Sequence, residues 1–198
     1  MADTVMVRDP LSGGVAVRRL DDAGRLDRAV VIDAVVGRLL CPGAPVELVR
    51  LHDRLDLSLD ESAACAGAYA RLVPAGPVEA ASLAVAQLWR LEEAGLLGEE
   101  LFAGVLRALA SRPERKLLRD ALSWAGDAVL RDAGRADAVL EAMALIFGQD
   151  TVALQERAVR LAVSLAPQAG PAGREAVLRA AAALPLELRE KVATVFGR

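Results

Sequence analysis

Hydrophobic residues recur along most of the chain at the three- and four-residue spacing of an amphipathic helix. In the segment 113–131, one face carries Leu118 and Leu122, while Arg119 lies on the opposite, polar face. The segment 150–166 repeats this arrangement. Such periodicity predicts helices, each of which buries one face against its neighbours.

Proline, glycine and serine residues mark the ends of these periodic segments, as expected at helix boundaries. Two stretches, Ser58-Leu59-Asp60-Glu61 and Ser111-Arg112-Pro113-Glu114, fit the capping box, in which the serine and glutamate side chains satisfy free backbone N–H groups. The boundaries predict helices at about 12–23, 26–40, 45–56, 59–72, 77–94, 98–111, 113–131, 135–147, 150–166, 172–184 and 186–196.

The first residues of the chain are compatible with two structures. Val5-Met6-Val7 and Val15-Ala16-Val17 flank a segment rich in turn-forming residues, which suits a short hairpin. The alternative begins the first helix at about Ser12, as the repeat described below requires. We favour the helix, and we expect residues 1–11 to be a loose segment and residues 12–198 to be a single helical-repeat domain.

A short motif occurs three times in the first half of the chain. The stretch Arg18-Arg19-Leu20-Asp21-Asp22-Ala23-Gly24-Arg25-Leu26 is nearly repeated at Trp89-Arg90-Leu91-Glu92-Glu93-Ala94-Gly95-Leu96-Leu97, and Arg54-Leu55-Asp56 lies between them. Leu20, Leu55 and Leu91 are 35 and 36 residues apart, a period typical of stacked two-helix units. The predicted fold is all-α, a right-handed α-solenoid of about five HEAT-like helical hairpins.

The residues beside these three leucines predict ion pairs between repeats. If the leucines face inward, their neighbours project about 100° to either side, toward adjacent units. We therefore expect an inter-repeat ladder that includes at least one pair such as Arg54 with Asp21 or Glu92, and that does not extend to Asp127. Each exposed pair contributes at most about 1 kcal/mol. The predicted ladder consists of Arg19, Arg54, Arg90, Asp21, Asp56 and Glu92.

Composition and charge narrow the functional classes. The chain has 198 residues, of which 54% are hydrophobic and 26% charged, with a formal net charge of −3. These values exclude a disordered chain and show no basic excess for nucleic-acid binding. Cys41 and Cys65 are too few for a disulfide framework or a zinc site, so we predict two buried free thiols. Neither a signal peptide nor a membrane span is evident, which predicts a cytoplasmic protein.

The sequence offers few residues for catalysis. His52 is the only histidine and lies beside an apolar stripe, so we interpret it as a packed side chain. Glu99 and Glu100 are adjacent, and on a helix they point about 100° apart, too far to act on one substrate atom. We therefore predict no enzymatic activity, no cofactor and no metal.

The two tryptophans have two interpretations. Trp89 and Trp124 are 35 residues apart and could form an aromatic ladder for a ligand. We favour the alternative, in which both rings fill space between helices.

The chain from about Gly24 to Leu161 resembles an uncharacterised HEAT-like helical-repeat family of high-GC bacteria. The resemblance implies a scaffold, often encoded beside SWIM zinc-finger, MoxR-type ATPase and von Willebrand factor A proteins, whose members are usually much longer than this chain. It rests on the order of the following matches: Gly24-Arg25-Leu26-Asp27, Leu51-His52, Ser58-Leu59-Asp60-Glu61 with Tyr69, Leu91 with Ala94-Gly95, Pro113 with Lys116, and Gln155-Glu156-Arg157-Ala158.

We predict that the protein is a non-catalytic scaffold that binds another protein, because a helical stack offers an extended surface. One alternative is a nucleic-acid-acting helical-repeat protein of the DNA glycosylase kind, with Arg119, Asp120 and Trp124 as candidate site residues. The net charge opposes it, since phosphate contacts dominate such binding. A second alternative is a purely structural segment of a larger assembly. We expect no membrane partner.

A basic cluster predicts where the partner binds. The polar faces of the helices at 113–131 and 150–166 should point the same way. They would form either a solvated surface of mixed charge or a groove for an acidic segment of another protein, whose carboxylates arginine binds in pairs. The predicted surface consists of Arg112, Lys116, Arg119, Arg157 and Arg160, with Asp120 and Glu156 among them.

Overall fold

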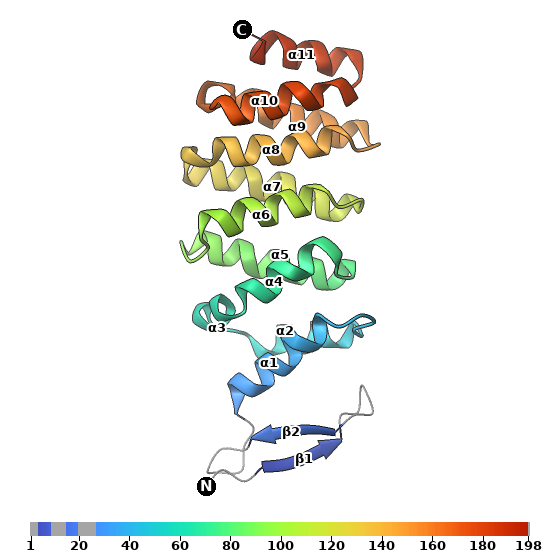
Figure 1. The fold of residues 1–198 in the computed structure, drawn as a ribbon, viewed down its shortest axis with the longest axis vertical. Helices are drawn as coiled ribbons and strands as arrows, with labels where there is room; N and C mark the ends of the chain where they lie inside the picture. The colour runs from blue at the N-terminus through green and yellow to red at the C-terminus, as the bar shows by residue number, and fades with distance from the viewer. Residues whose placement is uncertain (1–3, 9–14, 20–26, 198) are drawn as a thin grey trace. The chain divides into compact units, whose positions relative to one another are not determined.

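The computed structural model describes residues 4–8, 15–19 and 27–197 (Figure 1). From Arg28 onward the described chain contains helices and connecting turns and no strand, which confirms the predicted all-helical class for that part. The chain divides into two compact units, residues 1–68 and 69–198. The single helical-repeat domain expected for residues 12–198 stays a prediction. None of the described helices combines the length and the apolarity needed to cross a membrane.

The first unit begins with a two-stranded antiparallel hairpin. Strand β1 (Thr4–Arg8) pairs with strand β2 (Val15–Arg19), with Thr4 opposite Arg19 and Arg8 opposite Val15. The helix predicted at about 12–23 is therefore wrong for residues 15–19, and its remaining residues 12–14 and 20–23 lie outside the described part of the chain. Alternating valines favour extended backbone, and two consecutive glycines before β2 disfavour a helix, so local preference prevails over the repeat period.

Three helices follow in the first unit: α1 (Arg28–Leu39), α2 (Glu47–Leu55) and α3 (Leu59–Ala64). The predicted capping box at the start of α3 is confirmed, because Glu61 N donates to Ser58 Oγ over 3.2 Å and Ser58 N donates to Glu61 Oε2 over 2.8 Å. Arg28 links the start of α1 to this box, with 2.7 Å from its Nε to Glu61 Oε1. Arg28 Nη2 also donates to the carbonyl of Leu55, at the end of α2.

Two further predictions concern single residues of the first unit. His52 is buried, as predicted, and burial lowers its pKa although the nearby Asp53 carboxylate acts in the opposite direction. Cys65 is buried, but Cys41 is exposed, so the prediction of two buried thiols is wrong for Cys41. Cys41 follows the last residue of α1 by two positions, beyond the periodic face that the helix buries.

The second unit is entirely helical in its described part. Helix α4 crosses the division between the units, and the predicted helix at 59–72 is split into α3 and α4 at Cys65, which caps α3. The helices are α4 (Ala66–Ala75), α5 (Val78–Glu93), α6 (Glu99–Ala110), α7 (Arg115–Arg131), α8 (Ala136–Phe147), α9 (Val152–Leu165), α10 (Pro171–Ala180) and α11 (Leu186–Phe196), with short 3-10 helices at Ala133–Arg135, Ala166–Gln168 and Ala181–Ala183.

Alternate helices of the second unit lie side by side and form two layers (Figure 1). One layer contains α5, α7, α9 and α11, and the other contains α6, α8 and α10. The core lies between the layers, where α8 is the most enclosed helix because α6, α7, α9 and α10 all contact it. Its buried side chains are Val139, Leu140, Met143, Ile146 and Phe147, together with three alanines.

The connection from α6 to α7 differs from its prediction. Ser111 does not begin a capping box; it ends α6, and its Oγ donates to the carbonyl of Arg107 over 2.9 Å. Glu114 instead accepts hydrogen bonds from Arg112. Helix α7 therefore starts at Arg115, two residues later than predicted.

Candidate functional site

A buried carboxylate, Glu92, is the centre of an ionic cluster in the second unit. Its side chain is 1% exposed and accepts hydrogen bonds from Trp124 Nε1 and Arg131 Nε, each over 3.1 Å. Arg135 pairs with the same carboxylate and also with Glu99, 3.0 Å from its Nε to Glu99 Oε2. Burial alone would raise the pKa of Glu92, but the hydrogen bonds from Arg131, Trp124 and Arg135 outweigh it and hold this pKa below its usual range.

Aromatic rings pack against this cluster. Trp124 is fully buried, stacks on Trp89 with 6.2 Å between ring centroids, and meets the edge of Phe102 at 5.6 Å. The Arg135 guanidinium lies 4.8 Å from the centroid of the Phe102 ring. The packing interpretation of the two tryptophans agrees with this geometry, and Trp124 is enclosed too completely to stack on a nucleobase.

Within the described residues, Glu92 of the predicted inter-repeat ladder forms ion pairs, with Arg131 and Arg135 as its partners. Arg19 lies in β2, Asp21 lies outside the described residues, and Arg54 is exposed. Asp56 ends α2 with a φ of 45°, and its carbonyl oxygen accepts a hydrogen bond from Arg28 over 3.3 Å. Arg90, predicted to join the ladder, is exposed on α5. The idea of pairs about one repeat apart still describes the second unit, where Arg107 binds Glu141 and Arg135 binds Glu99.

A fourth copy of the motif explains the partners of Glu92. Leu130-Arg131-Asp132-Ala133-Gly134-Arg135 follows the same pattern as Leu91-Glu92-Glu93-Ala94-Gly95, with Arg131 at the position of Glu92. The charge reversal between equivalent positions places opposite charges on neighbouring repeats. Comparing every Ala-Gly pair that follows a charged residue would have revealed this copy in the sequence.

Arg112 does not belong to the predicted basic surface. It is buried, and its guanidinium donates to the carbonyls of Val73 and Gly76 at the end of α4, over 3.2 and 3.0 Å. Glu114 pairs with the same group, and this contact holds the pKa of Glu114 below its usual range. The role of Arg112 is structural, because backbone carbonyls at the end of a helix need hydrogen-bond donors from outside the helix. Arg112 precedes Pro113, and nothing in the sequence around it indicated a contact with the end of α4.

Lys116 and Arg119 are three residues apart, so they are neighbours on the surface of α7. Lys116 Nζ donates to Ser82 Oγ of α5 over 2.8 Å, so it turns toward α5. Arg119 is exposed and precedes Leu122 and Ser123 by three and four residues, so it lies on their side of the helix. Asp120, which follows Arg119 and lies one turn from Lys116, is half-buried; desolvation raises its pKa, although the charges of Lys116 and Arg119 act in the opposite direction.

Arg157 and Arg160 of α9 line a small hollow with Leu122 and Leu161, of about 170 Å³. Both arginines are exposed, and neither they nor Arg119 form a hydrogen bond or ion pair with another described residue. Glu156, predicted to lie among them, is also exposed. The structure therefore brings Arg157 and Arg160 together beside α7, with Arg119 one turn from Leu122.

A second hollow, of about 560 Å³, continues from the first, since both are lined by Leu122 and Leu161. Its other lining residues are Ser123, Gly126, Asp127, Val129 and Leu130 of α7, and Ser164 and Leu165 of α9. We call the two hollows together the α7–α9 groove. Along it, higher residue numbers on α7 face higher numbers on α9, so the two helices run in the same direction.

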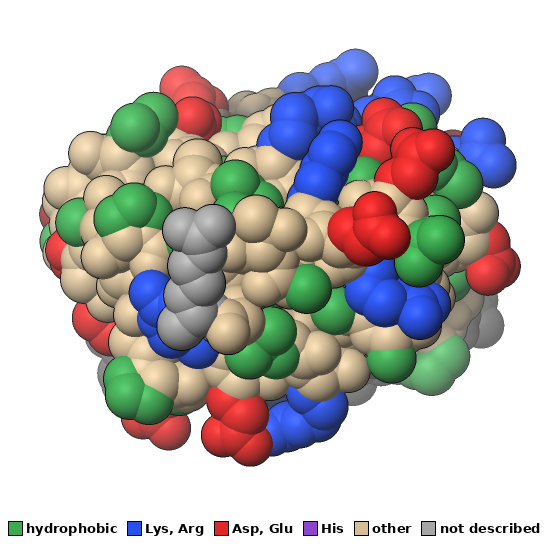
Figure 2. Space-filling view, turned by 90° about the horizontal axis from the view of Figure 1, so that it is seen from above, with side chains coloured by type: hydrophobic (Ala, Val, Ile, Leu, Met, Phe, Trp, Pro, Cys, Tyr) green, Lys and Arg blue, Asp and Glu red, His purple; other side chains and the backbone are tan. Residues whose placement is uncertain are grey.

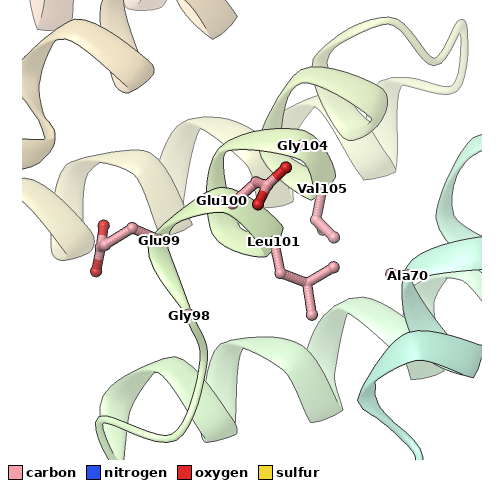
Figure 3. A pocket seen from close by; sticks show the side chains of 7 residues that line it. All are labelled: Ala70, Gly98, Glu99, Glu100, Leu101, Gly104 and Val105. Carbon is pink, nitrogen blue, oxygen red and sulfur yellow. The ribbon is translucent and has the colours of Figure 1, made fainter.

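A larger hollow, of about 640 Å³, lies at the start of α6. Figure 3 shows Leu101 and Val105 turned toward Ala70 of α4, whereas Glu99 points to the other side of the helix. Glu99 is already paired with Arg135. The remaining lining is two glycines and Glu100, so this hollow offers one free carboxylate beside an apolar patch.

The α11 end of the second unit has no comparable cluster. In the view onto that end, acidic, basic and hydrophobic side chains are interspersed (Figure 2). On α11 itself, Glu187 and Glu190 are exposed, and Arg189 is bonded to the carbonyls of Ala182 and Leu184. Among all described residues, no group of three or more His, Cys, Asp and Glu side chains is arranged to hold a metal ion.

Comparisons of the chain with protein-family models, with curated proteins and with solved structures give no match. The resemblance to the HEAT-like family therefore stays a prediction, and the candidate function depends on the geometry of the α7–α9 groove.

Proposed function

We propose that the chain is a non-catalytic scaffold that binds an acidic segment of another protein in the cytoplasm, and that its helical hairpins form a right-handed α-solenoid of the HEAT-like kind. Two observations support the solenoid: alternate helices form two layers, and α7 and α9 run in the same direction about one repeat apart.

The binding proposal rests on Arg157 and Arg160, which line one end of the α7–α9 groove, and on Arg119, one helical turn from Leu122 of the same end. Several other arginines of the second unit pair with carboxylates of the same chain, among them Arg107, Arg131 and Arg179. Arg119, Arg157 and Arg160 have no such partner among the described residues. Because an arginine guanidinium binds a carboxylate through two parallel hydrogen bonds, these side chains are suited to capture acidic residues of a partner.

A protein partner fits this surface better than a nucleic acid does. The chain has a formal net charge of −3, and binding to a phosphate backbone requires many basic contacts. Trp124, the aromatic residue closest in sequence to this cluster, is buried and bonded to Glu92. An acidic peptide needs only two or three arginines in one place.

Selection from a displayed library of random peptides tests the proposal. The full chain should enrich peptides rich in Asp and Glu. The variant Arg119→Glu/Arg160→Glu should keep its helicity and melting temperature while these peptides bind it at least about tenfold more weakly, chiefly through slower association at low salt.

The matched control is Arg50→Glu/Lys191→Glu, which makes the same change in net charge at two exposed residues far from α7 and α9 in the sequence. It should bind the selected peptides like the unchanged chain. If both double variants weaken binding equally, the effect is one of net charge and the proposed surface is wrong. Enrichment of peptides without acidic residues would also contradict the proposal.

A further inference from the structure

The α7–α9 groove changes in character along its length. The end lined by Arg157 and Arg160 is basic, and the hollow beyond it is lined by Leu122, Val129 and Leu165, which are 5%, 8% and 5% exposed. The hydroxyl of Ser164 donates to the carbonyl of Leu161 over 2.7 Å, so this donor is directed into its own helix. The second hollow is therefore an apolar site continuous with a basic one.

Gly126 leaves the floor of the second hollow open. It lies in the middle of α7, where glycine is less favourable than alanine, and no other part of the protein lies within 4 Å of the position that its Cβ would occupy. The glycine therefore does not serve close packing within the chain. It lowers the floor of the second hollow, so that a partner's backbone or side chain can come close to α7.

Leu130 stands at the edge of the second hollow and is 87% exposed. The other exposed large hydrophobic residues of the described chain have lower exposed fractions; Leu186, for example, is 66% exposed. An isolated exposed leucine needs no explanation, but this one borders an apolar hollow that begins beside unpaired arginines.

We propose that the α7–α9 groove binds an amphipathic helix of another protein, with carboxylates on Arg157 and Arg160 and aliphatic side chains in the second hollow. This inference rests on the proposed function and adds the second, apolar determinant. From Arg157 to Ser164 the groove extends seven residues, or about 10.5 Å at 1.5 Å per residue. The same distance separates residues i and i+7 on one face of a bound helix, which is the usual spacing of helix-in-groove anchors.

Asp127 gives the groove a selective element. Its carboxylate lines the second hollow, opposite in charge to the arginines at the first. An acidic residue placed at the apolar end would meet this carboxylate, whereas an aliphatic residue would meet Leu122, Val129 and Leu165. The groove therefore selects for separated acidic and apolar anchors, and not for a uniformly acidic segment.

Four synthetic helical peptides of equal length, built on one alanine-rich sequence, provide the test, with binding to the full chain measured by fluorescence anisotropy. The first carries two glutamates one turn apart and two leucines at i+7 from them on the same face. The second moves the leucines to the opposite face, the third replaces them with alanine, and the fourth replaces the glutamates with glutamine. We expect the first to bind at least about tenfold more tightly than each of the others.

Two protein variants with matched controls locate the apolar anchor. Gly126→Leu should fill the second hollow and weaken binding of the first peptide at least about tenfold. The control is Gly104→Leu, at another open helical glycine, in α6; it should leave this binding unchanged. Leu130→Asn should weaken binding of the first peptide several-fold, whereas Leu186→Asn, at an exposed leucine of α11, should leave this binding unchanged. Circular dichroism of all four variants checks that the helices are retained.

Each outcome discriminates. If the first three peptides bind equally and the fourth does not, the acidic capture stands and the amphipathic helix is wrong. If none binds, neither this peptide model nor the apolar anchor holds, while the library selection still decides the proposed function independently. Tighter binding of duplex DNA than of the first peptide overturns the inference, as does a dimer in sedimentation that Gly126→Leu dissociates, because the groove would then hold a second copy of this chain.

Discussion

Trp124 donates its indole N–H to the carboxylate of Glu92 over 3.1 Å, at a place where neither side chain reaches solvent. The bond joins the last turn of α5 to the middle of α7. An unpaired carboxylate in the interior would carry a large desolvation penalty. Arg131 and Arg135 neutralise the charge of Glu92, so the buried carboxylate is compensated by its partners.

Removing this carboxylate should destabilise the second unit strongly. Glu92→Ala leaves the Trp124 indole N–H and the Arg131 Nε–H without their acceptor and removes one of the two carboxylate partners of Arg135. The free energy of unfolding should fall by about 3–5 kcal/mol. Urea unfolding followed by tryptophan fluorescence measures the change. Glu93→Ala is the control, because Glu93 is 54% exposed and its carboxylate lies 3.8 Å from Arg131. This variant should change the free energy of unfolding by no more than about 1 kcal/mol. Equal losses of unfolding free energy in the two variants would show that the buried cluster contributes no more to stability than an exposed ion pair does.

The Glu61 carboxylate makes the first unit sensitive to acid. The hydrogen bond from Arg28, and next that from the Ser58 backbone, lower the pKa of Glu61 from 4.5 to about 2. A lowered folded-state pKa contributes stability that is complete above pH 4.5 and is lost as the pH falls toward 2. The difference in stability between the unchanged chain and Glu61→Gln should therefore be constant above pH 4.5 and shrink below it.

Amide hydrogen exchange in α1 and α3, measured across this pH range, follows the effect. Carbon NMR of the Glu61 carboxyl checks its cause directly. A titration midpoint near 4.5 would show that the bond to Arg28 does not persist in solution.

Two glycines should respond to the same substitution in opposite ways. A Cβ at Gly173 of α10 would lie 2.6 Å from Asp137 Oδ1 and 2.8 Å from Leu140 Cδ1 of α8, so Gly173→Ala should cost about 1–3 kcal/mol. Gly126→Ala meets open space and should be neutral or stabilise the protein by up to about 1 kcal/mol. Calorimetric melting temperatures of the two variants compare them, and a lower value for Gly126→Ala would mean that this position is not open.

Arg112 should affect stability and not peptide binding. Arg112→Gln removes charged hydrogen bonds to the carbonyls of Val73 and Gly76, which should reduce the free energy of unfolding by about 1.5–3 kcal/mol. Acidic peptides should bind the folded variant with unchanged affinity. Weaker binding, measured well below its melting temperature, would return Arg112 to the binding surface from which its burial removes it.

The helices from α1 onward could be predicted because their signals are local. Apolar periodicity places α5, α6 and α8 to within one or two residues at each end, and the capping box at Ser58 places the start of α3. The N-terminal hairpin was one of two structures that the sequence allowed, and the helix was favoured because the repeat period was given more weight than the alternating valines and paired glycines of residues 5–17.

The positions of the residues proposed to bind a partner were predictable only in part. The helical spacing of Arg157 and Arg160 places them on one exposed face, and Arg119 follows from the face of α7. Arg112 could not be assigned from sequence, because its burial depends on carbonyls at the end of α4, about one repeat away. The partners of Glu92 were missed for the same reason: Arg131 reverses the charge that the motif carries in its other copies, and only the packing of α5 against α7 brings the two together.

Arg131 has a consequence for the groove as well as for the core. Its guanidinium is held by Glu92, and its neighbour in the chain is Leu130, the exposed edge of the second hollow. The last turn of a helix ordinarily frays, and ordering it on association would cost conformational entropy. Because Glu92 pairs with Arg131, we expect that turn to be ordered before association. The proposed partner would then cover Leu130 with little further loss of backbone entropy.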